Sequence, residues 1–162
     1  MTKTTPSFAY RIVGEEGFAA VEPLWVKLRA YHSHLPWRFA DGMLRFTFEP
    51  RKLEILTKAA PGKLRIELVS AASDAADVAY CISTASASGR GEVDSIFVEE
   101  SLRRHGIGSE LIRHALAWLE SVGASSKVVT VAYSNEEALA LYKRFGFHPR
   151  TILLEKNHDN AA

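Results

Sequence analysis

The stretch that decides the fold is EVDSIFVEESLRRHGIG, at residues 92–108. Its first part, 92–98, carries valine, isoleucine and phenylalanine side chains, which are typical of a strand. Its last part, 103–108, holds two arginines and two glycines, and residues 107–122 then place apolar side chains every three or four positions. The stretch is therefore predicted to pass from a strand, through a short basic loop, into an amphipathic helix.

This loop has the chemistry of a phosphate-binding site. Gly106 and Gly108 let the backbone approach a ligand closely and turn its N–H groups outward. The amides of the first helical turn have no partner within the helix, and the helix end carries about half a positive charge. Arg103 and Arg104 add mobile positive charge beside them. The loop is not a P-loop, because no Gly-Lys-Ser/Thr ending follows.

Outward from this stretch, the pattern of apolar residues and turn residues divides the chain into helices and strands. Leu53 and Leu56 are expected to face inward from the second helix, and Ser134 with Glu137 forms a capping-box pattern before the last helix. We expect a strand at 8–13, a helix at 18–31, an irregular aromatic segment at 32–47, a helix at 48–59, strands at 64–68, 78–83 and 92–98, a helix at 107–122, a strand at 127–132, a helix at 135–145 and a strand at 147–154.

The resulting order, β-α-α-β-β-β-α-β-α-β, predicts an α/β fold with a mixed sheet and helices on both faces. The length of 162 residues fits one domain over 1–162. An ordered core is expected at about 8–155, with loose tails at 1–7 and 156–162.

Composition and charge exclude several classes of function. Lysine and arginine total 20 against 19 acidic residues, so long-range attraction to nucleic acid or to an anionic membrane is not expected. The single cysteine, Cys81, cannot form an internal disulfide, and no apolar run suits a leader or a membrane span. A cytoplasmic protein without a nucleic acid or membrane partner is predicted.

Three linked motifs resemble one family. Arg103-Arg104-His105-Gly106-Ile107-Gly108 resembles the acetyl-CoA signature of the GNAT family of N-acetyltransferases, Arg/Gln-x-x-Gly-x-Gly/Ala, without a gap. Residues 92–98 resemble that family's fourth strand, and Asn135, Tyr142 and Gly146-Phe147 repeat its Asn-x6-Tyr-x3-Gly-Phe ending. The close resemblance covers about residues 89–150 and implies the family's fold, with a mixed sheet of six to seven strands.

The resemblance implies an enzyme that transfers an acetyl group from acetyl-CoA to a primary amine of a small molecule or peptide. The amine would attack directly in a ternary complex. Two alternatives remain open: an acyl-CoA sensor that has lost transfer, and a transferase of a longer acyl group. Because relatives are often dimers, a homodimer is possible. No metal is implied.

In this family the fourth and fifth strands part, and the pantetheine arm of the cofactor fits between them. By resemblance, the backbone of 96–98 would bind that arm and the amides of 104–109 would hold the pyrophosphate. A backbone N–H near Ile96 or Phe97 would polarise the thioester carbonyl. The implied cofactor-binding set is Ile96, Phe97, Val98, Arg103, Arg104, His105, Gly106, Ile107, Gly108, Ser109, Asn135 and Tyr142.

Amine acetylation needs a base and an acid. A lysine-like amine with a pKa near ~10.4 is almost wholly protonated at neutral pH, and the departing thiolate benefits from a proton donor. Tyr142 is the candidate acid, because the family has a tyrosine at this place pointing at the sulfur; the alternative is that it only completes the apolar stripe of its helix. Glu92 stands eleven residues ahead of Arg103, where the histone-acetylating branch has its catalytic glutamate. Asp94 projects to the same strand face, and a water chain is the third candidate base.

Other candidate residues carry two interpretations each. Asn135 either touches the cofactor or stabilises a helix start. The aromatic segment between the first two helices often forms the acceptor wall in relatives, and the alternative is that it covers the sheet as core. Cys81 is interpreted as a small buried residue, and His32 and His34 lack further ligands for a metal. The candidate acceptor residues are His34, Trp37, Phe39 and Phe46, with Arg38 and Phe48 beside them.

Overall fold

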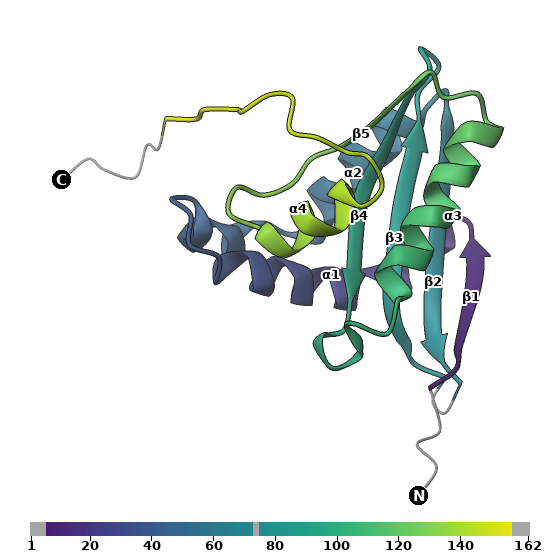
Figure 1. The fold of residues 1–162 in the computed structure, drawn as a ribbon, viewed down its shortest axis with the longest axis horizontal. Helices are drawn as coiled ribbons and strands as arrows, with labels where there is room; N and C mark the ends of the chain where they lie inside the picture. The colour runs from purple at the N-terminus through teal and green to yellow at the C-terminus, as the bar shows by residue number, and fades with distance from the viewer. Residues whose placement is uncertain (1–5, 73–74, 157–162) are drawn as a thin grey trace, which may run out of the picture.

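A five-stranded mixed sheet organises the computed structural model, which describes residues 6–72 and 75–156 (Figure 1). The outer parts of the two expected tails, 1–5 and 157–162, lie outside the described residues. The strands are β1 (Phe8–Val13), β2 (Lys63–Ala71), β3 (Asp77–Ala85), β4 (Arg90–Val98) and β5 (Ser126–Val129). The α-helices are α1 (Phe18–Ser33), α2 (Phe48–Ala59), α3 (Ile107–Ser121) and α4 (Glu136–Lys143), and the 3₁₀ helices are η1 (Glu15–Gly17), η2 (Ala40–Arg45) and η3 (Glu100–Leu102).

The strand order follows the chain, β1-β2-β3-β4-β5. The first three neighbouring pairs are antiparallel and β4–β5 is parallel, as the predicted hairpins and the later crossover require. The expected mixed sheet with helices on both faces is confirmed.

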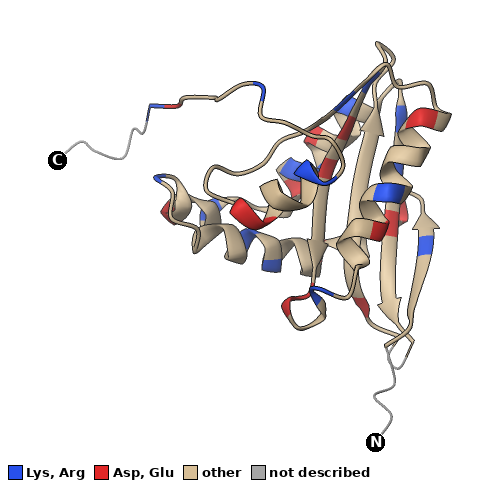
Figure 2. Ribbon diagram, in the orientation of Figure 1, with Lys and Arg blue, Asp and Glu red and all other residues tan. Residues whose placement is uncertain are grey.

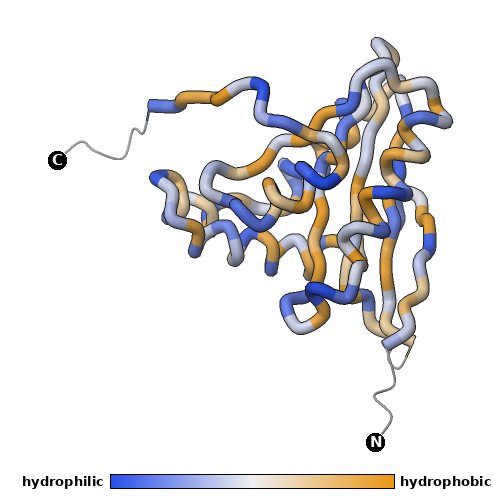
Figure 3. Tube along the Cα trace, in the orientation of Figure 1, coloured by the Kyte–Doolittle hydropathy of each residue, from blue (hydrophilic) through white to orange (hydrophobic). Residues whose placement is uncertain are grey.

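Each face of the sheet has its own apolar core. One core joins α1 and α2 to the sheet through Phe18, Phe48, Ile66, Tyr80 and Phe97, among others. The second joins α3 and α4 to the other face, and its fully buried members include Leu111 and Ile112. In Figure 3 the strands between these two layers carry much of the apolar colour. Only a strand buried on both faces needs apolar side chains in both directions, which explains the continuous apolar run in β3.

The second helix has the predicted bounds but a different inward face. Phe48, Ile55 and Ala59 are its buried residues, so its apolar stripe runs through positions i, i+7 and i+11. Leu53 lies on the other side of that stripe and is 66% exposed, so the expectation that it faces inward was wrong. Leu56 is half-buried against the core, as expected.

The predicted last strand is absent from the described residues. Residues 147–156 have no regular secondary structure, and β5 ends at Val129 rather than at Ala132. The sheet therefore has five strands in place of the expected six to seven. Ile152, Leu153 and Leu154 are strongly exposed. Figure 3 shows apolar colour on the C-terminal segment that leads away from the sheet. The apolar composition of this segment fits a strand, but a strand also needs a free edge to pair with, and composition does not report that.

In Figure 2 the positions of basic and acidic residues alternate along the helices, strands and loops of the described chain. This mixture agrees with the near-balanced composition. Among residues 6–72 and 75–156, no helix has the length and apolar character to cross a membrane.

Candidate active site

The centre of the candidate site is the point where β4 and β5 stop pairing. Their parallel pairing runs only from Arg90↔Ser126 to Val93↔Val129. Beyond it β4 continues to Val98, whereas the chain after Val129 leaves the sheet. We call this feature the β4–β5 split. Within the described part of the chain, it leaves residues 94–98 without a strand partner on the side of β4 that faces away from β3, as the family resemblance implied.

A bulge in β4 marks the start of the split. Ile82 of β3 is opposite Ser95 and Ser83 is opposite Val93, so Asp94 is the extra residue with no partner on β3. Such a bulge bends a strand and increases its local twist. It also changes the alternation of side chains: Val93, Ile96 and Val98 face the α3 layer, whereas Phe97 faces the α1 layer.

The N-terminus of α3 lies at the end of the loop that follows β4. Gly106 caps the helix with a left-handed φ of 83°, and no side chain bonds the helix start. The first backbone bond runs from Glu110 N to Gly106 O at 3.0 Å, so the amides of 107–109 have no backbone acceptor in the described chain. A Cβ at Gly106 would meet no atom within 4 Å, so this helix start faces open space. We call Gly106 and the free amides of 107–109 the α3 cradle.

The two arginines of the signature have different roles. Arg103 donates from Nε to the carbonyl oxygen of Val98 at 3.2 Å, its guanidinium lies 4.8 Å from the ring centre of Tyr31, and it pairs with Glu137 at 3.6 Å. It is therefore fixed by the protein, and the expectation that it supplies mobile charge was wrong. Arg104 is exposed and pairs with no described residue, so it alone keeps that role.

The cradle is braced by two further side chains. His105 Nδ1 lies 3.1 Å from the carbonyl oxygens of Leu102 and Arg103, and the imidazole donates to this turn rather than reaching outward. Arg144, at the end of α4, donates to Ser109 Oγ at 3.2 Å. Arg144 is not among the predicted site residues, although a basic residue at the end of a helix is a common signal.

Tyr142 lies in the apolar core on the α3–α4 side of the sheet, so its packing interpretation is confirmed, and its role as the acid stays a prediction. Its side chain is 4% exposed, and its ring packs edge-on against Phe147 with centroids 5.7 Å apart. Burial raises the pKa of Tyr142 well above the ordinary value of a tyrosine, so the phenol keeps its proton at neutral pH. Its hydroxyl forms no hydrogen bond with any described residue, so it remains available to a ligand.

Asn135, not Ser134, caps α4. Asn135 Oδ1 accepts the amide of Ala138 at 3.2 Å. Ser134 has a left-handed φ of 70°, which does not suit the extended backbone of a capping residue, and its hydroxyl instead donates to Pro36 O. The capping-box prediction was therefore wrong by one residue. Tyr31 Oη also lies 3.5 Å from Asn135 Oδ1, which brings the end of α1 to the start of α4.

The candidate bases Glu92 and Asp94 project to one face of β4, as expected, and a lysine of α2 joins them. Lys58 Nζ lies 3.2 Å from Glu92 Oε2 and also pairs with Asp94. The Glu92 side chain is 13% exposed, whereas that of Asp94 is fully buried. Burial raises the pKa of Asp94, and its bonds with Lys58 and with Thr84 Oγ1, at 2.7 Å, act in the opposite direction.

The candidate acceptor residues separate into three environments. Phe48 is buried against Phe18 and Trp25, so it belongs to the core. Trp37 and Phe39 form a half-buried edge-on pair with centroids 5.9 Å apart, and Phe46 is 60% exposed. His34 and Arg38 are also exposed, and His34 Nδ1 lies 2.7 Å from Ala30 O at the end of α1.

The environment of Cys81 agrees with its interpretation as a small buried residue. Cys81 is buried, and burial raises the pKa of its thiol to about 12, which keeps it from forming the reactive thiolate. No group of three metal-ligating side chains occurs within the described ranges.

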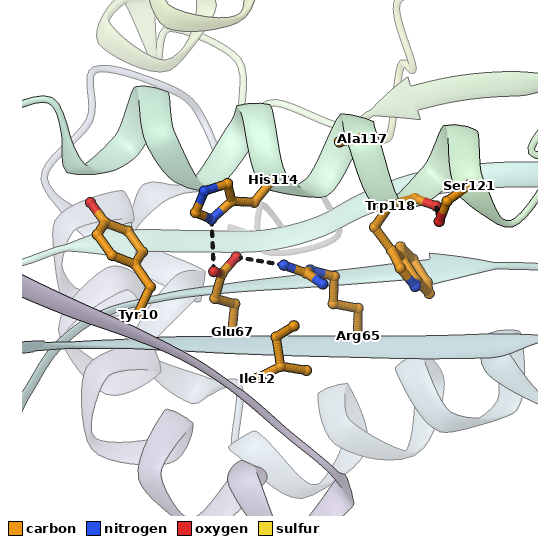
Figure 4. Close-up of a pocket in the computed structure, with 8 residues that line it drawn as sticks. All are labelled: Tyr10, Ile12, Arg65, Glu67, His114, Ala117, Trp118 and Ser121. Atoms are coloured by element: carbon orange, nitrogen blue, oxygen red, sulfur yellow. Dashed lines mark hydrogen bonds and ion pairs between the residues drawn. The ribbon is translucent and has the colours of Figure 1, made fainter.

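A cavity of about 510 Å³ lies elsewhere, between β1, β2 and α3 (Figure 4). Glu67 sits at its centre, 3.1 Å from Arg65 and 2.8 Å from His114 Nδ1. Tyr10 and Trp118 flank these groups, and no candidate residue from the sequence analysis lines the cavity.

Comparisons with known proteins bear on the family and the fold of the chain. The ribosomal protein bS18-alanine N-acetyltransferase of Escherichia coli (strain K12) is 36% identical over 58 residues, which span 36% of this chain and 39% of that protein. The chain thus matches about two fifths of the length of that relative.

Solved structures match over nearly the whole chain. An aminoglycoside N-acetyltransferase in complex with CoA has a TM-score of 0.64 at 16% identity, covering 98% of this chain and 99% of that one. The ribosomal-protein-S18-alanine N-acetyltransferase from Escherichia coli has a TM-score of 0.61 at 18% identity, covering 90% and 80%. At these identities the likeness shows the fold. The family model described as "Acetyltransferase (GNAT) family" matches residues 42–147. The chain belongs to the GNAT family of acetyltransferases.

Proposed function

We propose that this protein is an N-acetyltransferase that moves an acetyl group from acetyl-CoA to a primary amine of a small molecule or peptide. The observation that carries the proposal is the β4–β5 split lying next to the N-terminus of α3, where no side chain bonds the first amides. The split offers a free backbone edge for the pantetheine arm, and the helix start offers free amides for the pyrophosphate. Membership of the acetyltransferase family supports the same donor.

On the donor side, the backbone of 96–98 would bind the pantetheine arm and the amides of 104–109 would bind the pyrophosphate. Arg104 supports this role because its charge is unpaired within the described chain, and Arg144 supports it because it already contacts Ser109 at the helix start. Arg103 has a different part: it holds the Val98 carbonyl and so fixes the end of the strand. Asn135 would contact the cofactor through its amide nitrogen, since its oxygen is used as the helix cap.

For the chemistry, we assign the base to Glu92 and the acid to Tyr142. Glu92 is partly exposed, whereas Asp94 is buried and accepts a bond from Thr84, so Asp94 serves to hold the site in place. Glu92 takes a proton from the acceptor ammonium, and the amine nitrogen then bonds to the acetyl carbon as the carbon–sulfur bond breaks. Tyr142 gives its proton to the departing thiolate. The new amide nitrogen loses its second proton through water to the Tyr142 phenolate, and Glu92 releases its proton to solvent.

The acceptor would approach from the α1–α2 side of β4. His34, Trp37, Phe39 and Phe46 form the proposed acceptor wall, which lies close to α4 because Ser134 bonds Pro36 O. The names of the relatives give an aminoglycoside and a ribosomal-protein alanine as their acceptors, and both are amines. A cytoplasmic location and a homodimer stay predictions.

The test is a thiol-release assay with acetyl-CoA over a panel of amines that includes aminoglycosides and peptides with a free N-terminus. We expect acetyl-CoA-dependent release with at least one amine and a mass increase of one acetyl group on it. Tight binding of acetyl-CoA by calorimetry with no turnover across the panel would favour the sensor alternative. Faster release from propionyl- or succinyl-CoA would favour a longer acyl donor.

A further inference from the structure

Charged side chains from α2 surround the candidate base Glu92. Lys58 from α2 pairs with both Glu92 and Asp94 on β4. Among the described residues, Arg51 also contacts this group, because it donates to Asp94 O at 2.6 Å, and Arg51 pairs in turn with the exposed Glu54 at 2.8 Å. These five groups carry two positive and three negative charges, so their net charge is −1. We call Lys58, Glu92 and Asp94 the carboxylate cluster.

A net charge of −1 matches the proposed reaction. The acceptor amine reaches the enzyme chiefly as an ammonium ion, because its pKa of roughly 10 lies well above neutral pH. A partly buried group with one excess negative charge attracts this cation. After Glu92 accepts one proton, Lys58 and Asp94 remain as a neutral ion pair, so no buried charge is left without a partner.

We propose that Lys58 is a positioning residue for acyl transfer, which keeps Glu92 and Asp94 charged together so that the carboxylate cluster binds the acceptor ammonium and accepts one proton from it. The proposal rests on the proposed function and adds a residue from α2 to the site on β4. Without Lys58, two neighbouring carboxylates lack a cation. One of them then holds a proton at higher pH, and the base is lost near neutrality.

The first test is the pH profile of kcat/KM for Lys58→Met with the best amine of the panel. We expect its acidic limb to move to higher pH by about one unit or more, with most of the activity regained near pH 9. Lys58→Arg keeps the charge and is expected to retain the wild-type limb. Lys52→Met is the matched control, because Lys52 is on the same helix and contacts Glu49, at 3.9 Å, and the ring of Phe18, but neither Glu92 nor Asp94.

The decisive variant combines Lys58→Met with Asp94→Asn. It removes one positive and one negative charge, so the net charge returns to −1 and the acidic limb is expected to return toward its wild-type position. A lysine that only stabilises the fold predicts the opposite, because the second substitution then removes another buried contact and adds to the damage. Thermal melts of each variant report folding separately.

A readout independent of turnover separates this proposal from the proposed function. The carboxyl carbons of the cluster are titrated by ¹³C NMR in wild type and Lys58→Met, with Glu92→Gln and Asp94→Asn for assignment. An upward move of the titration midpoint in Lys58→Met supports the proposal. Turnover of an amine with neither the midpoint nor the acidic limb moved overturns the role of Lys58 alone. Absence of turnover by wild type on every amine overturns the proposed function instead.

Discussion

The two faces of β4 are built from different kinds of interaction. On the α3–α4 face, Val93, Ile96 and Val98 pack into an apolar core with Tyr142. On the α1–α2 face, Glu92 and Asp94 meet a lysine from α2. The bulge at Asp94 interrupts the alternation of side chains between these two faces.

This difference explains how one strand can serve two substrates. The proposed donor side offers a free backbone edge and free amides, which suit the shared phosphate and pantetheine parts of any acyl-CoA. The proposed acceptor side offers side chains and charge, which suit one class of acceptor. Changes on the acceptor face should therefore alter catalysis without altering cofactor affinity, and changes at the α3 cradle should do the reverse.

The largest expected effect is that of Glu92→Gln. The amide cannot accept the proton, so we expect kcat/KM near pH 7 to fall by about 10³-fold while acetyl-CoA affinity stays within twofold. Thiol-release kinetics and calorimetry measure the two quantities. An unchanged rate would move the role of base from Glu92 to a water chain and would break the proposed division between the faces.

Tyr142→Phe tests the same difference between the two faces of β4 from the apolar α3–α4 face. We expect kcat to fall by about 10²-fold, because the departing thiolate loses its proton donor, while the phenyl ring keeps the packing against Phe147. The free energy of unfolding from urea melts should change little, since the hydroxyl bonds no described residue. A full rate at neutral pH would leave Tyr142 with only its packing role.

Gly106→Ala is the corresponding test of the cradle. Alanine resists the left-handed backbone of Gly106, so we expect the affinity for CoA to fall by about tenfold, equivalent to about 1.4 kcal/mol. Gly123→Ala is the matched control, because Gly123 has a φ of 77° and equally open space at its Cβ position. Both should lose similar stability, and only Gly106→Ala should weaken CoA binding in calorimetry. Equal affinities would remove the cradle from the site.

The α3 cradle and the acceptor face of β4 also differ in how far they could be predicted from the sequence. The cradle and the strand before it lie within residues 92–108, so local patterns were sufficient to place them. Lys58 is 34 residues from Glu92, and no local pattern connects the two. The prediction of a last strand was wrong for the same reason. Residues 147–154 have the composition of a strand, but tertiary structure decides whether an edge is available for pairing. Arg103 was misjudged because its partners Tyr31 and Glu137 come from α1 and α4.

The burial of Cys81 in the apolar core of the α3–α4 face predicts how the free energy of unfolding depends on pH. Burial raises the pKa of Cys81 to about 12, so the folded protein keeps a proton that the unfolded chain loses above about pH 9. The contribution of the protonated Cys81 thiol to the free energy of unfolding is complete below pH 9 and is lost as the pH rises toward 12. Urea melts should therefore show the free energy of unfolding falling by on the order of 1 kcal/mol per pH unit above pH 9. Cys81→Ala should have a shallower fall, and identical slopes would mean that water reaches this core.

Asn135→Ala has the smallest expected effect and separates the two roles of Asn135. Loss of the cap bond to Ala138 should cost about 1 kcal/mol of unfolding free energy in urea melts without ligand. Ser134→Ala is the control: its hydroxyl bonds Pro36 O and caps no helix, so it should leave α4 intact. If Asn135 also contacts the cofactor, the difference between Asn135→Ala and wild type widens when CoA is added, because ligand binding stabilises only the folded state. An unchanged difference would confine Asn135 to the helix start, and recognition of the cofactor would then rest on the α3 cradle and the free edge of β4.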